Sequence, residues 1–331
     1  MFVTVVIPMR NADNFIEAAL DSVCGNALVR QIIVVDDYST DCSAEKVADY
    51  AAKDSRVALF RHTQQKGAGA ARNTGFAFAE EKYCIFLDAD DDLKPAALDE
   101  CALVLEGCPA DFLVFKWYYC DADGRFEQMR MLAQDEAIWQ AITGGALIFP
   151  ATTDARNNSD ILRTANFPWH KLYSTDFLRR SGVHFSDTLV HNDNLAHWMS
   201  YAKCSSFVLY SKYLIGHHES RQKNSLTQIW DQRRLQIFDV FDEIDSFLLS
   251  DRAYFSYFLQ FARYKAQMID WIGRFIDNPI LSRFAKNAVK TFAMLNFELF
   301  CRIAAADPEA GKRIYDVIHN TYGYLHKIRR Q

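Results

Sequence analysis

Residues 83–92 have the sequence YCIFLDADDD, in which an acidic cluster directly follows an apolar run. Five mostly apolar residues, Tyr83 to Leu87, are typical of a buried strand. Four carboxylates fall within the next five positions, and like charges this close raise one another's pKa. A divalent cation, which prefers oxygen ligands, would remove that cost. The pattern predicts a metal at a strand end, with Asp88 and Asp90 on one side of the chain.

The same residues have a second interpretation that involves no ligand. An acidic surface turn could cap the helix that is expected to begin near Pro95, since carboxylates are favoured at helix N-termini. Other parts of the sequence are needed to distinguish a metal site from a solvated turn.

Composition restricts the class of protein. The chain has 331 residues, half of them hydrophobic, which is enough for a sizeable core and more than one domain. No run of 18 apolar residues predicts a transmembrane helix, and the chain starts with a strand pattern rather than a signal peptide. Eight scattered cysteines without a C-x-x-C pair favour the reducing cytoplasm over disulfides or a zinc site.

Charge is distributed unevenly along the chain. The formal net charge is −5, whereas residues 229–331 carry 15 basic and 12 acidic side chains, a balance of +3. This excess is too small to indicate nucleic-acid binding. The positive excess is compatible with contact between this region and an anionic membrane surface. We expect a cytoplasmic protein that could bind peripherally at the inner membrane.

Strand and helix patterns alternate through the first 120 residues. The expected strands are Phe2–Ile7, Gln31–Val35, Val57–Arg61, Tyr83–Leu87 and Asp111–Tyr119. Strands that are apolar on both faces and alternate with helices predict a mostly parallel sheet covered by helices, an α/β fold. Ligands of such sheets bind beyond the carboxyl ends of the strands. Three polar segments are expected at that edge: Pro8–Asn11, Asp36–Asp37 and Asp88–Asp92.

The pattern weakens between residues 124 and 166 and then changes character. A strand is expected at Ser206–Leu214, followed by a polar segment with His217, His218, Arg221 and Lys223. After residue 226 apolar residues recur at helical spacing, with helices expected over Leu281–Ala304 and Pro308–Ile328. We therefore expect domains at 1–226, with halves of about 1–120 and about 121–226, and at 227–331, a helical region through which copies could associate.

Six motifs, in this order, resemble those of the family 2 glycosyltransferases of the GT-A type, especially bacterial enzymes that build surface polysaccharides. They are residues 5–11 (VVIPMRN), 34–41 (VVDDYSTD), 67–75 (GAGAARNTG), 86–91 (FLDADD), 169–173 (WHKLY) and 192–193 (ND). The resemblance covers roughly residues 1–226. It implies a Rossmann-like GT-A fold, mostly parallel with helices on both faces, followed by an α-helical C-terminal region.

The resemblance also implies a reaction. A sugar would move from a nucleotide-diphosphate donor, typically UDP-linked, to a hydroxyl of a glycan or lipid-linked acceptor. The anomeric centre would be inverted, and Mn²⁺ or Mg²⁺ would assist. Such reactions serve polysaccharide, lipopolysaccharide or capsule synthesis. The sequence departs from the family at Tyr38, where Gly is usual, and at Asn192, where an acidic residue is usual.

Carried over position by position, the resemblance implies a nucleotide-sugar pocket formed by Pro8, Asn11, Asp36, Asp37, Lys66, Arg72, Asp88, Ala89 and Arg221. Within it, Asp37 would hydrogen-bond the base. The implied metal ligands are Asp90, Asp88 and Asp91, with His217 or His218 as a late ligand. The implied acceptor residues are Trp169, Lys171 and Asn192, beside Asp193 as general base.

Several of these assignments have structural alternatives. Asp193 precedes an apolar helical run, so it could be a plain helix N-cap. Trp169 could be a core residue, and Arg72 could position its loop without contacting the donor. Two adjacent histidines in an extended segment point in opposite directions, so at most one of His217 and His218 is expected to be a ligand.

Three other functions compete with sugar transfer. A sugar nucleotidyltransferase would carry a Gly-rich loop after the first strand, where this chain has Pro8-Met9-Arg10-Asn11. A phosphatase with an aspartate nucleophile would have its D-x-D after the first strand, not the fourth. A non-catalytic nucleotide-sugar-binding or scaffold protein would have no need for both the acidic cluster and Asp193.

Overall fold

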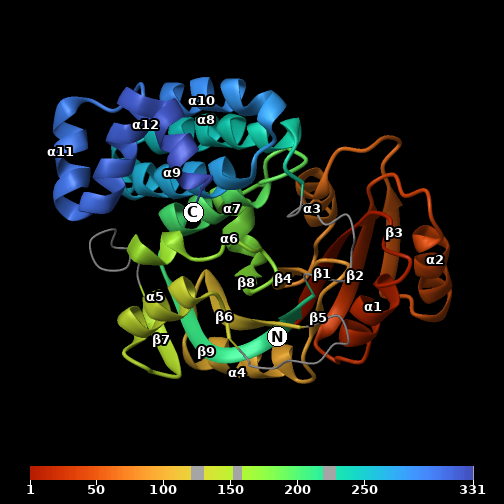
Figure 1. Ribbon diagram of the computed structural model, residues 1–331. Coiled ribbons are helices and arrows are strands. Elements are labelled where there is room, and N and C mark those ends of the chain that lie inside the picture. The colour runs from red at the N-terminus through yellow and green to blue at the C-terminus, as the bar shows by residue number, and fades with distance from the viewer. Residues whose placement is uncertain (121–129, 152–158, 219–228, 331) are drawn as a thin grey trace. The chain divides into compact units, whose positions relative to one another are not determined.

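The computed structural model describes residues 1–120, 130–151, 159–218 and 229–330 (Figure 1). The chain divides into two compact units, Met1–Lys223 and Asn224–Gln331. The first unit is built around one sheet, and the second consists of helices.

Parallel strands form the first half of the sheet. They are β1 (Val3–Met9), β2 (Val29–Asp36), β3 (Val57–Arg61) and β4 (Tyr83–Phe86), in the spatial order β3-β2-β1-β4. The crossover helices are α1 (Ile16–Cys24), α2 (Ser43–Lys53) and α3 (Ala68–Phe76). Every residue of β1 is buried, so both of its faces are covered. This arrangement confirms the expected α/β fold.

Helix α3 packs very closely on this part of the sheet because of a glycine. A Cβ added at Gly75 would lie 2.4 Å from Val6 Cγ1 and 3.2 Å from Val35 Cγ2. Only a residue without a side chain permits this approach. The N-terminal end of α3 is thereby held over the carboxyl ends of β1 and β2.

The second half of the sheet is mixed in direction. Strand β8 (Lys171–Ser174) runs antiparallel between β4 and β6 (Phe112–Tyr119), and β9 (Phe207–His217) runs parallel to β6. Two short strands, β7 (Ile148–Ala151) and β5 (Asp92–Leu93), pair antiparallel with β9. The sequence pattern did not predict β5, β7 or β8, because two to four residues are too few to show a period.

The pairing of β5 with β9 determines where the acidic cluster lies. Asp92 pairs with Gly216, so the acidic cluster lies beside the end of β9. Strand β9 also ends three residues later than expected, at His217 rather than Leu214. Residues 91–92 and 217–218, which are distant in sequence, therefore become neighbours.

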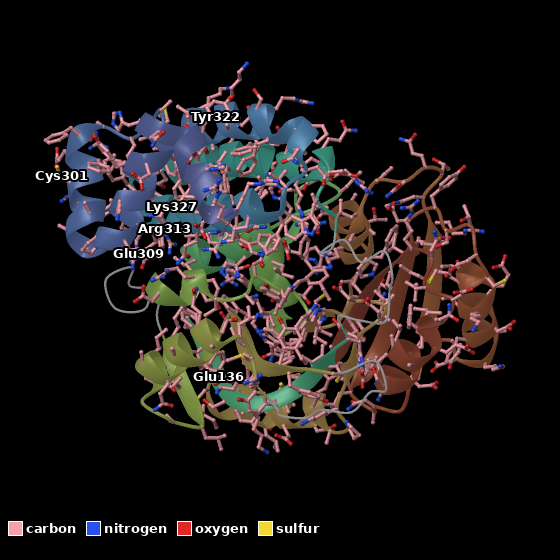
Figure 2. The ribbon with its side chains drawn as sticks, viewed as in Figure 1. Glu136, Cys301, Glu309, Arg313, Tyr322 and Lys327 are labelled. Carbon is pink, nitrogen blue, oxygen red and sulfur yellow. The ribbon has the colours of Figure 1, made fainter. Side chains whose placement is uncertain are left out.

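The described part of the first unit also contains the α-helices α4 (Ala97–Gly107), α5 (Ala133–Thr143), α6 (Thr175–Ser181) and α7 (Asp193–Lys203). Helix α5, in the stretch of weak pattern, is fixed to the sheet by Glu136, which Figure 2 labels. Its carboxylate accepts a hydrogen bond from Lys116 Nζ on β6 at 2.6 Å and another from the hydroxyl of Tyr213 on β9. Polar contacts of this kind do not contribute to the apolar periodicity, so the sequence pattern does not reveal them.

The second unit consists of α8 (Gln236–Leu249), α9 (Phe255–Phe275), α10 (Leu281–Lys290), α11 (Phe297–Ala306) and α12 (Pro308–Ile328). Figure 2 shows Cys301 on α11, and Glu309, Arg313, Tyr322 and Lys327 on α12. Among the described residues, none of the helices combines the length and apolarity needed to cross a membrane.

The helical range predicted over residues 281–304 is interrupted in the structure. Helix α10 ends at Lys290 and α11 begins at Phe297, so residues 291–296 lie outside both helices. The side chain of Asn296 caps α11 by accepting from Leu299 N at 2.9 Å, and the Thr291 carbonyl accepts from Lys265 Nζ at 3.1 Å. Polar groups outside the apolar pattern therefore divide the helix.

Lys265 also forms a buried ion pair in this unit. Its Nζ donates to both carboxylate oxygens of Asp245, at 3.0 and 2.8 Å, and so joins α9 to α8. Phe258, Phe261 and Phe292 surround the ammonium. Removing one partner of a buried pair leaves the other charge without compensation, which costs more than replacing both.

We predict that Lys265→Met lowers the free energy of unfolding by about 3 to 5 kcal/mol, because Asp245 stays buried without its cation. Adding Asp245→Leu should restore most of the loss. Denaturant titration of the two variants measures both effects. An unchanged midpoint for Lys265→Met would show that the pair contributes nothing.

Candidate functional site

The two carboxylates at the end of β2 are occupied by loop backbone and basic side chains. Asp37 is buried and accepts from the N–H groups of Lys66 (2.8 Å) and Gly67 (2.7 Å). It also lies 2.8 Å from His62 Nδ1. Asp36 accepts from Ser39 N and from Arg61 Nε, both at 2.9 Å. These residues shape the loops around the predicted nucleotide pocket.

The turn after β1 is joined to the loop after β2. Asn11 Oδ1 accepts from Thr40 N at 2.9 Å, and Ser39 Oγ accepts from Asn11 N at 2.9 Å. Asn11 and Tyr38 both adopt left-handed backbone, with φ of 48° and 66°. At position 38 this conformation favours glycine, which gives a physical reason for the residue usual in the resembling family. Tyr38 is half exposed at the rim.

The remaining predicted pocket residues lie in different environments. Pro8 is buried in β1, and Ala89 is buried after β4. Lys66 has an exposed side chain above the loop that its backbone fixes to Asp37. Arg221, and with it Lys223, lies outside the described residues.

Arg72 joins three segments that are far apart in the sequence. It extends from α3, is almost fully buried, and donates from Nη2 to Asp88 Oδ1 at 2.6 Å. Its Nη1 donates to Asn192 Oδ1 at 2.8 Å. One guanidinium thus connects the end of β4 to the start of α7. The sequence suggested that Arg72 could position its loop without contacting the donor. Its two partners, Asp88 and Asn192, are identified only by the structure.

A glycine makes this connection possible. A Cβ on Gly69 would lie 2.3 Å from the Ser186 carbonyl oxygen and 2.8 Å from Asn192 Cβ. The first turn of α3 therefore touches the segment that leads into α7. Any side chain at position 69 would push Arg72 away from Asn192.

Asp193 follows Asn192 and faces the same charges. It is the first residue of α7, and no side chain caps this helix, so the N-cap alternative is not supported. Burial raises the pKa of Asp193 to about 6, while the charges of Arg72 and Lys171 oppose the increase and Asp88 adds to it. A carboxyl with a pKa near neutrality suits a general base. Asp193 and Asp88 thus share one electrostatic environment.

The acidic cluster is partly neutralised by histidines. Asp91 is buried and lies 3.0 Å from His217 Nδ1, and it accepts from His218 N at 3.1 Å. The Nε2 atom of His218 contacts Asp92. Helix α4 begins only at Ala97 and has no side-chain cap, so the capping-turn alternative is wrong.

Asp90 is the carboxylate of the cluster whose compensation is outweighed by burial and crowding. Burial, followed by the charges of Asp91 and Asp88, raises the pKa of Asp90 to about 7. The charge of His217 and the backbone N–H of Asp90 itself oppose this increase. A cation at this position would relieve the crowding.

The donor set fits a metal that is bound mainly through a substrate. In the part of the chain that the structure describes, no group of three or more His, Cys, Asp or Glu side chains could hold a metal ion. Mg²⁺, however, is commonly bound by one or two carboxylates together with substrate phosphates. Asp90, with Asp88 close by, fits that mode. His217 and His218 are both engaged by carboxylates, so either would have to leave its partner to act as a ligand.

Aromatic rings form a wall behind His217. Trp169 stacks on His217 with 5.3 Å between ring centroids, and Phe167 stacks on Trp169 at 4.6 Å. Trp169 and Lys171 are at most 1% exposed, so these expected acceptor residues lie behind the surface rather than on it. Asn192 is also buried and uses its carbonyl oxygen for Arg72.

Sequence reasoning missed His62. It lies directly after β3 and bridges Asp37 and Thr74, with His62 Nε2 3.0 Å from Thr74 Oγ1. A histidine at the carboxyl end of a third parallel strand was a usable signal, since the other polar segments follow β1, β2 and β4.

Comparisons with known proteins identify the family of the chain. The family described as Glycosyl transferase family 2 matches residues 4–177. An uncharacterized glycosyltransferase of Bacillus subtilis, EpsJ, is 27% identical over 188 residues, which are 56% of this chain and 52% of EpsJ. The Escherichia coli glucosyltransferase WfgD, which uses UDP-Glc, is 36% identical over 90 residues, 27% of this chain and 35% of WfgD. The chain thus spans about half or less of these relatives.

A solved structure supports the fold. Crystalline Staphylococcus aureus TarS 1-349 in complex with UDP-GlcNAc superposes with a TM-score of 0.71 and 16% identity. The match covers 98% of this chain and 92% of that one. At this identity the likeness establishes the GT-A-like architecture, a mixed sheet followed by a helical region.

We predict that Gly69→Ala destabilises the protein by about 2 kcal/mol or more, because the new methyl group meets backbone at 2.3 Å. Gly107→Ala is the matched control. It also lies in a helix, has nothing within 4 Å of the added Cβ, and should be neutral or slightly stabilising. Thermal unfolding of both variants compares them, and equal effects would exclude a tight α3 contact.

Proposed function

The chain belongs to glycosyl transferase family 2, and from this premise we propose that it transfers a sugar from a nucleoside-diphosphate sugar to a hydroxyl of a glycan or lipid-linked acceptor. The observation that carries the proposal is the Arg72 bridge, which joins Asp88 beneath the acidic cluster to Asn192 next to Asp193. Donor-side and acceptor-side carboxylates are thereby held in one site.

The donor would bind along the carboxyl ends of β1, β2 and β4. The uridine nucleotide of the TarS complex makes a UDP-sugar the first candidate. Asp37 already accepts three hydrogen bonds, and a carboxylate has about four lone-pair sites, so one position remains for the N–H of a base. Pro8, Asn11, Asp36, Lys66, Ala89 and Arg221 remain the proposed surroundings of the nucleotide.

Asp193 would act as the general base in a single displacement. Its carboxylate takes the proton of the acceptor hydroxyl, and the oxygen attacks the anomeric carbon from the face opposite the diphosphate. The bond to the diphosphate breaks with both electrons on the leaving oxygen, which inverts the anomeric centre. The pKa of about 6 keeps most of Asp193 deprotonated at neutral pH.

A divalent cation, Mn²⁺ or Mg²⁺, would supply charge stabilisation for the diphosphate when bound. Asp90 would hold it, with Asp88 and Asp91 nearby. Arg72 keeps Asp88 in place on one side, and His217 keeps Asp91 in place on the other. The chain's contribution is to hold these carboxylates close together despite their repulsion.

The wider setting is also proposed. Residues 1–226 would carry the reaction, with the nucleotide-sugar half at about 1–120 and the acceptor half at about 121–226. Residues 227–331 would form the helical region through which copies could associate. All eight cysteines are free thiols, which favours a cytoplasmic enzyme in surface-polysaccharide synthesis, with contact at the inner membrane. A non-catalytic sugar-nucleotide binder would share the donor site and would lack transfer.

We predict that Asp193→Asn retains donor binding within about threefold and loses transfer by about 10²-fold or more, because only the proton acceptor is removed. Asp90→Ala should weaken both, as measured by Mn²⁺-dependent thermal stabilisation with a panel of nucleotide sugars and by release of nucleoside diphosphate.

Asp49→Asn, an exposed residue of α2, is the control and should leave both measurements unchanged. Full transfer activity in Asp193→Asn would refute the base assignment. Donor binding by the unmodified protein, with no transfer to any hydroxyl acceptor, would instead favour the non-catalytic binder.

A further inference from the structure

His62 connects the candidate nucleotide pocket to the helix beside it. It directly follows β3, and its backbone N–H donates to the Asp36 carbonyl at 2.9 Å, which extends the pairing of β3 with β2. Its ring is held at both nitrogens, with Nδ1 2.8 Å from Asp37 Oδ1 and Nε2 3.0 Å from Thr74 Oγ1 on α3. The side chains of His62 and Asp37 are only 6% and 4% exposed. The ring therefore cannot turn away from the carboxylate without breaking buried contacts.

The surroundings of the ring decide which atoms donate. Asp37 Oδ1 also accepts from the backbone N–H of Lys66 at 2.8 Å, and Oδ2 accepts from that of Gly67 at 2.7 Å. A carboxylate that receives N–H groups at both oxygens acts as an acceptor, so His62 Nδ1 carries a hydrogen and donates it. In the neutral ring Nε2 is then the acceptor, and the Thr74 hydroxyl donates to it.

These hydrogen bonds are divided unequally between the two oxygens of Asp37. Oδ1 accepts from His62 and from Lys66, whereas Oδ2 accepts from Gly67. Each carboxylate oxygen has about two lone-pair sites. Counting only contacts among the described residues, Oδ1 is fully occupied and Oδ2 keeps one site for a ligand.

Nucleobases differ in how many adjacent N–H groups they present to a carboxylate. Guanine presents N1–H next to its exocyclic amine, and it pairs best with a carboxylate through both oxygens. Uracil presents N3–H alone, between two carbonyl oxygens, so one acceptor site is enough for it. A site that leaves one N–H of a base without an acceptor loses affinity, because a desolvated donor without a partner is costly.

We propose that His62 is a positioning residue that sets the base specificity of the donor site. By occupying Asp37 Oδ1, it leaves the carboxylate a single acceptor site, which suits uracil and disfavours guanine. The inference rests on the proposed role of Asp37 in binding the base of the donor. It assigns His62 an effect through Asp37, without contact between the imidazole and the nucleotide.

The two nitrogens of His62 separate specificity from stability. The Nδ1 contact acts on Asp37 and hence on the base, whereas the Nε2 contact ties the end of β3 to α3. Asparagine can reproduce the first contact, because its side-chain amide supplies an N–H donor in place of Nδ1. Phenylalanine keeps a ring at this position and reproduces neither contact.

The test measures the dissociation constants of UDP and GDP by calorimetry in the presence of Mn²⁺. The two nucleotides share the ribose and the diphosphate, so the ratio of the GDP constant to the UDP constant reports the base. We expect this ratio to be about ten or more in the unmodified protein. In His62→Phe it should fall about fivefold or more, because Oδ1 becomes free to accept the second N–H of guanine.

Three further variants test the cause of this change. His62→Ala, which removes the same donor and adds no larger ring, should show the same fall. His62→Asn should keep the ratio of the unmodified protein, because it restores the donor to Asp37. Thr74→Val is the matched structural control. It removes the partner of Nε2, so it should lower the melting temperature and keep the ratio within about twofold.

An unchanged ratio in both His62→Phe and His62→Ala would overturn the inference, even if both nucleotides bind more weakly, because His62 would then only stabilise the loop. An equal fall in His62→Asn would also overturn it, as would tighter binding of GDP than of UDP by the unmodified protein.

These binding measurements need no acceptor, so they separate this inference from the proposed function. An unchanged ratio in a protein that transfers sugar would contradict the role of His62 alone. The expected fall of the ratio in a protein without transfer would support that role and contradict only the proposed function. Binding of neither nucleotide would contradict both.

Discussion

The buried guanidinium of Arg72 is the interaction on which the candidate site depends. It binds Asp88 at 2.6 Å and Asn192 at 2.8 Å, and so ties α3, the end of β4 and the start of α7 together. Charge-assisted hydrogen bonds from a planar, preorganised group are stronger and more directional than neutral ones. A second polar contact supports the bridge, because Asn73 on α3 exchanges hydrogen bonds with the backbone of Phe185 at 2.8 and 2.9 Å. The absence of a side chain at Gly69 allows the helix to come close enough for the bridge to form.

Around this bridge, different groups compensate the negative charges of the carboxylates. Asp37 is held by two backbone N–H groups and a histidine, so it stabilises a loop. Asp91 is held by His217, whereas Asp90 carries the raised pKa of a crowded carboxyl. A carboxylate that protein donors already satisfy gains little from a cation, while a crowded one gains much. The aspartates of the site therefore differ in how much each would gain from a bound cation.

Each unit contains a buried lysine, and the two lysines have different surroundings. In the helical unit, Lys265 joins two helices through Asp245 within a phenylalanine shell. In the sheet unit, Lys171 binds the carbonyl of Phe167, a residue in the aromatic wall. The first arrangement joins two helices, whereas the second joins a strand to the aromatic rings behind His217.

The sequence alone determined the α/β pattern, the positions of β1 to β4 along the chain, and the polar segments at their ends, because parallel buried strands are apolar throughout and end where polar residues begin. The spatial order β3-β2-β1-β4 came from the tertiary structure. It also identified Asp88 and Asp90 as candidates, since an acidic cluster stands out after an apolar run, whereas Asp193 was implied by the family resemblance. Short strands such as β5 and β8 carry no periodic signal, so their pairing, which places Asp92 beside Gly216, was decided by the tertiary structure. The same holds for the burial of Lys171, the three partners of Asp37 and the two partners of Arg72. Each depends on contacts between residues tens of positions apart, and local sequence does not encode which distant groups will satisfy a buried charge.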